Sequence, residues 1–210
     1  LSTTDHSGCA AILHQLNADL AGSGVRVSIP SQRLDSFGVE MAAEVSGARR
    51  GGLTFAPEAG SQRLRDVINK NVSEEDIELA ARNAFEAGWR RMKLYFMMGL
   101  PTETDEDVVG IASVAQRVLD IGREVVGRGY KSGVSVSISV AVFVPKAHTP
   151  FQWSAQLGRD EVIRRQRLLL ASTHDRDIKV SYHDADVSLV EAVLSKMGRA
   201  GFDLVMAAWR

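Results

Sequence analysis

Residues 134–144 have the sequence Val-Ser-Val-Ser-Ile-Ser-Val-Ala-Val-Phe-Val. This strict alternation predicts a β-strand with branched apolar side chains on one face and small side chains, mainly serines, on the other. The branched face is suited to packing against helices. The serine face leaves room for a ligand on the opposite side, which favours a barrel with a spacious lumen.

The segments around this strand alternate between strand and helix patterns with short connections. We expect further strands at 25–29, 52–56, 92–98 and 178–182, and helices at 7–20, 36–45, 62–68, 73–87, 104–126, 160–171, 188–196 and from 203 onward. Two of these helices start with a capping pattern, Ser73-Glu74-Glu75-Asp76 and Thr104-Asp105-Glu106-Asp107. The nearly all-apolar segment 92–98 is typical of a strand that is buried on both faces. A repeated βα order predicts a parallel sheet with right-handed crossovers.

Composition excludes several classes of protein. The 210 residues carry a net charge of −1 and contain one cysteine, Cys9. The charge gives no general attraction to nucleic acid or membranes, and no apolar run is long enough to span a bilayer. A single cysteine excludes an internal disulfide framework, so we expect a cytoplasmic protein. The chain starts within a strand pattern and stops within a helical one, so we expect both ends to be cut from a longer polypeptide.

Ligands of parallel βα folds bind at the carboxyl ends of the strands. The polar residues that follow the expected strands are therefore the candidates: Thr4, Asp5, Ser31, Arg33, Glu58, Ser61, Thr102, Glu103, Lys146 and His148. Glu58 suits the hydroxyls of a ribose, or alternatively the dipole of the following helix. Lys70 suits a ligand carboxylate, or is a solvated lysine at a helix end. The proline-containing tail 143–151 is either an edge for a flat heterocycle or a rigid loop.

Taken in order, these segments resemble the radical S-adenosylmethionine (SAM) superfamily. Residues 52–61, Gly-Leu-Thr-Phe-Ala-Pro-Glu-Ala-Gly-Ser, are similar to its fourth strand, 97–104 to its fifth-strand motif and 143–151 to its sixth. The resemblance implies that Glu58 holds the ribose of SAM and Lys70 its carboxylate. The other residues that we assign to SAM binding are Ser61, Met98, Gly99, Val144, Pro145, Thr4 and Ser31.

The implied fold is α/β: a partial (βα)6-type barrel, residues 1–183, truncated at its N-terminus and followed by a helical extension, residues 184–210. The implied reaction is reductive cleavage of SAM to a 5′-deoxyadenosyl radical that acts on an unknown substrate, with electrons from a flavodoxin- or ferredoxin-type donor. The closest likeness is to uncharacterised bacterial members in which a cobalamin-binding-like region often precedes the barrel, so cobalamin is a candidate cofactor.

Two departures from the family pattern stand out. The family holds a [4Fe–4S] cluster through a Cys-x3-Cys-x2-Cys loop, whereas this chain has Cys9 alone. We therefore expect no metal site and no tightly bound cofactor in this fragment, which by itself would be inactive. Thr102 also stands where many members have glycine.

Two other functions are compatible with the sequence. A cluster-free barrel could bind a phosphorylated metabolite where Gly60-Ser61 starts a helix. A non-catalytic RNA-binding module could use arginines, but these lack interleaved aromatic residues, and nucleic acid is not indicated. The arginines concerned are Arg63, Arg65, Arg90 and Arg91.

Overall fold

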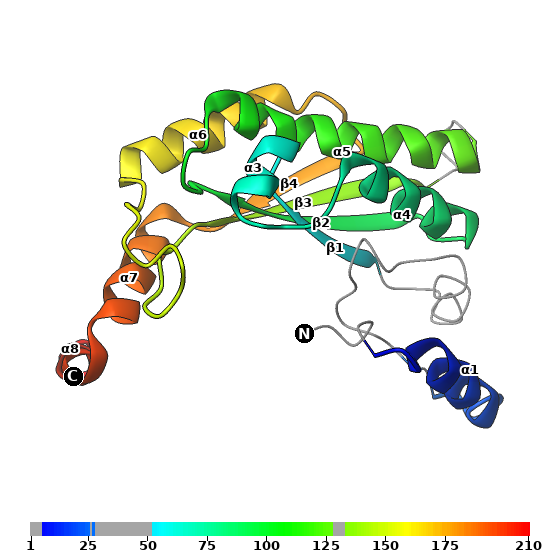
Figure 1. Cartoon of the computed structure of the whole chain (residues 1–210), viewed down its shortest axis with the longest axis horizontal. Helices are drawn as coiled ribbons and strands as arrows, with labels where there is room; N and C mark the ends of the chain where they lie inside the picture. Colours follow the sequence, from blue (N-terminus) through cyan, green and yellow to red (C-terminus); the bar gives the residue numbers. More distant parts are fainter. Residues whose placement is uncertain (1–5, 26, 28–51, 128–132) are drawn as a thin grey trace.

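The computed structural model describes residues 6–25, 27, 52–127 and 133–210. Four parallel strands form one sheet in the order β1-β2-β3-β4 (Figure 1). Their bounds are Leu53–Glu58, Arg91–Met98, Ser135–Val142 and Ile178–Tyr182. The helices are α1 (Cys9–Asp19), α3 (Gln62–Val67), α4 (Glu74–Glu86), α5 (Asp105–Val126), α6 (Arg159–Ser172), α7 (Ala185–Lys196) and α8 (Gly201–Trp209), with a short 3-10 helix at Gly198–Ala200.

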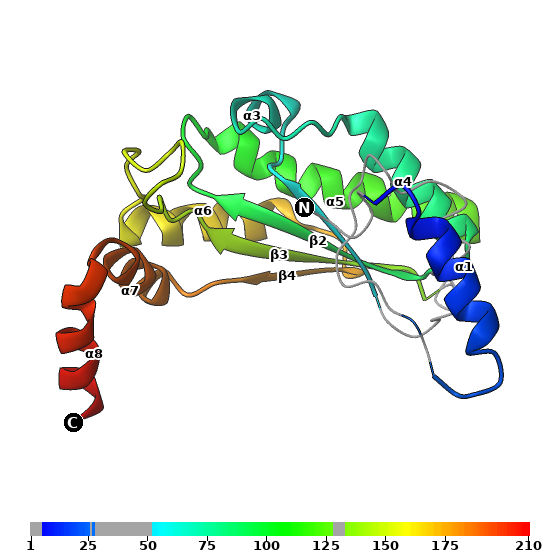
Figure 2. The ribbon, with the colours of Figure 1, turned by 60° about the horizontal axis from the view of Figure 1, so that its bottom comes forward.

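The strand order shows how the sheet is wound. Strands that follow one another in sequence are also neighbours in the sheet, and α4, α5 and α6 lie along the same face of it (Figures 1 and 2). A doubly wound sheet would have helices on both faces. The α/β class and the partial barrel that the sequence predicts are therefore confirmed.

The alternating pattern of β3 accounts for the main core. Val136, Ile138 and Val140 are buried, and the serines between them are only half-buried. The branched side chains join the core cluster with the apolar side of α5. Gly122 lets this helix approach closely, because a Cβ atom there would lie 2.7 Å from the side chains of Phe85 and Val134.

The opposite face of the sheet differs from the expectation for 92–98. Lys93 and Met97 are half-buried and Tyr95 is 40% exposed, so among the described residues only one face of β2 is fully buried. The prediction of two buried faces was wrong because it counted apolar residues without their alternation. Lys93 and Tyr95 alternate with Leu94 and Phe96, which belong to the core, so they lie on the opposite face of β2. No described helix crosses that face of β2–β4 (Figures 1 and 2).

Both predicted capping boxes are present. Asp76 accepts from the Ser73 N–H at 2.8 Å and donates its own N–H to the Ser73 hydroxyl at 3.1 Å. Asp107 accepts from the Thr104 N–H at 2.7 Å. Such boxes satisfy N–H groups that a helix start leaves unpaired, so both helices begin where the sequence predicts.

Beyond β4 the chain is helical, and α7 and α8 lie past the carboxyl end of the sheet (Figure 1). Helix α7 begins three residues earlier than expected, because the Asp184 side chain accepts from the N–H groups of Asp186 and Val187. The division of the chain near residue 184 stays a prediction. No helix in the described part of the chain is long and apolar enough to cross a membrane.

Several predictions lie wholly or mostly outside the described residues. They are the strand at 25–29, the helix at 36–45 and the candidate residues Thr4, Asp5, Ser31 and Arg33.

Candidate functional site

Glu58 is the last residue of β1, and it is one of four described non-glycine residues with a positive φ, together with Asn69, Thr102 and His148. Its φ is +70°, in the left-handed region that a residue with a Cβ atom rarely adopts. The pairing with β2 shifts register between Phe55 and Glu58, next to Pro57, which has no N–H to donate. Strain of this kind is often found at functional sites. The outlier thus marks Glu58 as a functional candidate independently of its side chain.

The Glu58 carboxylate lies next to Lys70. Lys70 Nζ is 3.3 Å from Glu58 Oε1, and the two side chains are 34% and 27% exposed. The sequence assigned them to different groups of one ligand, and the structure brings them together in a direct ion pair. Because both side chains keep an exposed surface, a ligand with complementary groups can reach them.

Arg65 braces the two loops that carry this pair. Its guanidinium is fully buried and donates to the carbonyl oxygens of Ala59 and Val72, each at 3.1 Å. Burial lowers the pKa of Arg65, against the opposing effect of Glu74. Ala59 follows Glu58 and Val72 lies two residues after Lys70, so Arg65 fixes the segments on which the pair stands.

The assignment of Arg65 to an RNA-binding surface is wrong, because this side chain has no exposed surface. The signal that was missed is its position in the helix. Arg65 lies beside Leu64 and three residues before Ile68, on the apolar stripe of α3.

Asp107, in the first turn of α5, ties together the loops after β1 and β2. It accepts hydrogen bonds from the Ser61 hydroxyl, from Arg63 and from Thr104. Burial opposes its charge, but these hydrogen bonds together hold the pKa of Asp107 below its ordinary value. The sequence indicated Asp107 only as a capping residue, because its partners in the other loop are more than 40 residues away.

Ser61 caps α3, accepting from the Leu64 N–H, and donates to Asp107, so its hydroxyl has partners within the protein. Gly60 packs directly against α5: a Cβ atom there would lie 2.2 Å from the Asp107 carbonyl oxygen. This glycine therefore serves the close contact with α5. Both observations weaken the phosphate-binding interpretation of Gly60-Ser61.

The turn after β2 is held by Glu103. Gly99, with φ +88°, donates its N–H to Glu103 Oε2 at 2.6 Å, and the same oxygen accepts from Arg165. The Glu103 side chain is buried, and this burial raises its pKa even though Arg165 and the Gly99 N–H act in the opposite direction. Glu103 is thus a structural residue, not a polar group at the mouth of the barrel.

Thr102 keeps the turn even though the family pattern has glycine there. Its φ is +69°, and Arg63 donates to its hydroxyl and to its carbonyl oxygen, at 3.2 and 2.9 Å. The glycine-like backbone is therefore retained by a threonine.

The remaining candidates contribute main-chain groups. The Phe143 N–H donates to the Met98 carbonyl oxygen at 2.8 Å, which extends the β2–β3 ladder by one residue. Met98 itself has no exposed surface. Val144 and Pro145 are buried. Beyond them, Lys146 is exposed and pairs with Glu191 at 3.0 Å.

The described residues differ in how well they match the ligand sets of metal ions and of SAM. Within the described ranges no group of three or more His, Cys, Asp or Glu side chains could hold a metal ion, and Cys9 is buried. One cysteine does not fit the three-thiolate ligand set of a [4Fe–4S] cluster. The Glu58–Lys70 pair does fit SAM, because a carboxylate accepts from ribose hydroxyls and an ammonium pairs with a carboxylate.

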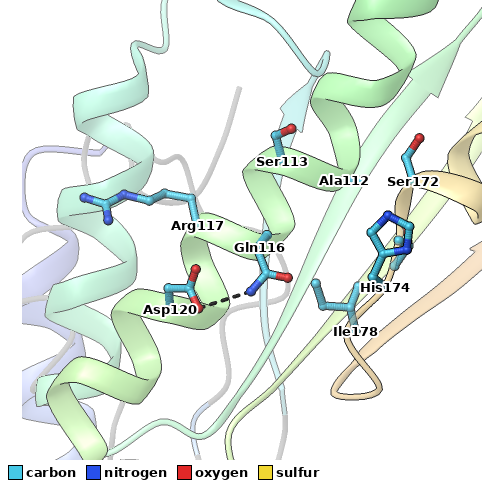
Figure 3. Close-up of a pocket in the computed structure, with 9 residues that line it drawn as sticks. Ala112, Ser113, Gln116, Arg117, Asp120, Ser172, His174 and Ile178 are labelled. Carbon is cyan, nitrogen blue, oxygen red and sulfur yellow. Dashed lines mark hydrogen bonds between the residues drawn. The ribbon is translucent and has the colours of Figure 1, made fainter.

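Two surface cavities lie in the helical layer, and neither contains a residue predicted to bind SAM. One, of about 370 Å³, lies between α5 and the end of α6; its lining includes Gln116, Asp120 and His174 (Figure 3). Gln116 donates to Asp120 at 3.1 Å. The other, of about 250 Å³, lies between α4 and α5. The first is separate from the carboxyl edge of the sheet, whereas the second extends to Gly60, two residues after the end of β1.

Comparison with known proteins supports the resemblance. A sequence model of the radical SAM superfamily matches residues 2–115. An uncharacterized protein of Methanocaldococcus jannaschii is 38% identical over 129 residues, which are 61% of this chain and 26% of that protein. A sugar phosphate isomerase/epimerase from Parabacteroides distasonis aligns over 75% of this chain and 56% of its own, with 12% identity and a TM-score of 0.36.

Proposed function

Because this chain belongs to the radical SAM superfamily, we propose that the full-length protein cleaves SAM reductively to a 5′-deoxyadenosyl radical. An iron–sulfur cluster would supply the electron for this step, held by cysteines outside these 210 residues. A flavodoxin- or ferredoxin-type donor in the cytoplasm would reduce it. Cobalamin remains a candidate second cofactor.

The observation that carries the proposal is the strained, ion-paired Glu58. Its carboxylate would accept hydrogen bonds from the ribose hydroxyls, and Lys70 would pair with the methionine carboxylate. Without ligand the two side chains neutralise each other across 3.3 Å. Because SAM brings both a diol and a carboxylate, it can replace this one contact by two charge-assisted ones.

The main chain at the neighbouring strand ends would border the adenine. The groups concerned belong to Met98, Gly99, Val144 and Pro145. The Gly99 N–H is already used by Glu103, so the adenine would meet carbonyl oxygens here and not this donor. Ser61 would act indirectly, by holding the loop after β1 in place.

Calorimetric titration of the full-length protein with SAM tests the proposal. Glu58→Ala should weaken SAM binding by about 1–3 kcal/mol, the usual scale for losing hydrogen bonds to a charged group. Lys70→Ala should cost less, because cluster iron would also ligate that carboxylate. Glu75→Gln, an exposed change in the first turn of α4, is the matched control and should bind SAM as wild type does.

The same titration separates the proposal from the phosphorylated-metabolite barrel. If Glu58→Ala and Lys70→Ala bind SAM as wild type does, while a Ser61→Ala change abolishes binding of a phosphorylated compound, the metabolite barrel is the better account. We expect Glu58→Ala and Lys70→Ala to weaken SAM binding and Ser61→Ala to have no such effect on a phosphorylated compound, because the Ser61 hydroxyl is already bonded to Asp107 and Leu64.

A further inference from the structure

The face of the sheet opposite the helices is arranged in rows across the strands. Strand pairing places Thr54, Lys93, Ser137 and Lys179 side by side in one row. The next row toward the carboxyl end contains Tyr95, Ser139 and Ser181, and the one after it Met97 and Ala141. Residues two apart in a strand share a face, so all of these side chains stand on the half-buried or exposed side.

This face changes in character along the strands. Its amino-terminal half carries the lysines Lys93 and Lys179 among hydroxyl groups, whereas Met97 and Ala141 near the carboxyl edge are apolar. Glu58 is the one acidic residue in the four strands, and it lies at the carboxyl end, paired with Lys70. No described carboxylate of the sheet therefore neutralises the lysine row.

The two lysines are placed to act together. Lys93 Nζ lies 4.6 Å from the centre of the Tyr95 ring, and neither lysine forms an ion pair with the described residues. They are separated by the strand that carries Ser137, which puts their backbones about 10 Å apart. Flexible lysine side chains can span this gap, so an anion above Ser137 would meet two ammonium groups and a hydroxyl.

We propose that this row binds the anionic group, a carboxylate or a phosphate, of a small elongated substrate whose apolar part reaches toward Met97 and Ala141. This inference rests on the proposed function, which places the reactive end of SAM near the carboxyl edge. Lys93 and Met97 are four residues apart, about 13 Å along the strand. The substrate therefore carries its charge about 13 Å from the carbon that reacts.

Three probes of one chain length test this surface by calorimetric titration of the full-length protein. Hexanoate and hexyl phosphate carry the two anionic groups, and hexanol carries neither. We expect at least one anion to bind and hexanol to show no measurable binding; the tighter anion identifies the group. If hexanol binds as tightly as both anions do, or if neither anion binds, the inference is wrong.

Variants locate the binding. Lys93→Gln/Lys179→Gln should weaken anion binding at least tenfold, because two charge-assisted contacts are lost. Lys196→Gln, which removes one charge from exposed α7, is the control and should bind as wild type does. Circular dichroism checks that the variants fold, and the single change Lys179→Gln, at an exposed position, should still weaken binding. Equal anion binding by the double variant and wild type would overturn the inference.

SAM titration of the same proteins separates this inference from the proposed function. The double lysine variant should bind SAM normally, and Glu58→Ala should bind the anion normally. If wild type fails to bind SAM while anion binding still depends on the lysines, the proposed function fails and the anion site stands. If SAM binding depends on Glu58 but the lysine substitutions leave anion binding unchanged, the anion site fails and the proposed function stands.

Discussion

Replacing Asp107 by asparagine tests how the loops of the candidate site are held. The asparagine can place its oxygen toward Arg63 and Thr104 and its amide nitrogen toward Ser61. The Ser61 hydroxyl then changes from donor to acceptor, so the contacts survive while the charge is lost. Hydrogen bonds to a charged group contribute about 1.5–3 kcal/mol and neutral ones about 0.5–1.5. The bonds from Arg63 and from the Thr104 N–H should each lose about 1 kcal/mol.

Burial partly offsets this loss of stability, because burying a charged carboxylate costs more free energy than burying a neutral amide. We therefore expect Asp107→Asn to lower the free energy of unfolding by about 1–2 kcal/mol at pH 7, measured by urea denaturation. Asp105→Asn, in the same helical turn, is the control. Asp105 pairs with Arg164 at the surface, so this change should leave the urea midpoint close to that of wild type.

The effect should depend on pH with a definite sign. The pKa of Asp107 is lowered on folding, so its contribution to stability is complete above its unfolded pKa, about 3.9, and is lost as the pH falls through the lower folded value. The difference between wild type and Asp107→Asn should thus be constant above about pH 5 and shrink below about pH 4. If Asp107→Asn is as stable as wild type at pH 7, the view that this charge holds the loops together is refuted.

Two further substitutions probe the same loops. Arg65→Met should lower the free energy of unfolding by about 2–4 kcal/mol in urea titrations, because the buried carbonyls of Ala59 and Val72 lose their donor. Arg82→Met, at a half-buried position in an ion pair with Glu124, should change it little, and equal losses would contradict the bracing role. Thr102→Gly should raise the free energy of unfolding by about 0.5–1 kcal/mol, since glycine relieves the positive φ; a loss of stability would show that the contacts from Arg63 outweigh the strain.

The sequence by itself determined the features that depend on local periodicity. The alternation at 134–144 predicts a strand with one buried face, and the signals at Ser73 and Thr104 predict the starts of two helices. These hold because alternation and capping involve residues within about four positions of one another, so neighbouring side chains are enough to specify them. The placement of Glu58 at the carboxyl edge follows in the same way from the end of its strand.

Only the tertiary structure decided what each polar side chain contacts. Arg63 meets Asp107 across 44 positions, and Arg165 meets Glu103 across 62. The sequence presents such residues simply as charges, so it could not distinguish the structural Glu103 from a ligand-binding carboxylate. The physical reason is that a buried charge is stable only where hydrogen-bonding groups surround it, and the folded chain brings those groups from distant positions in the sequence.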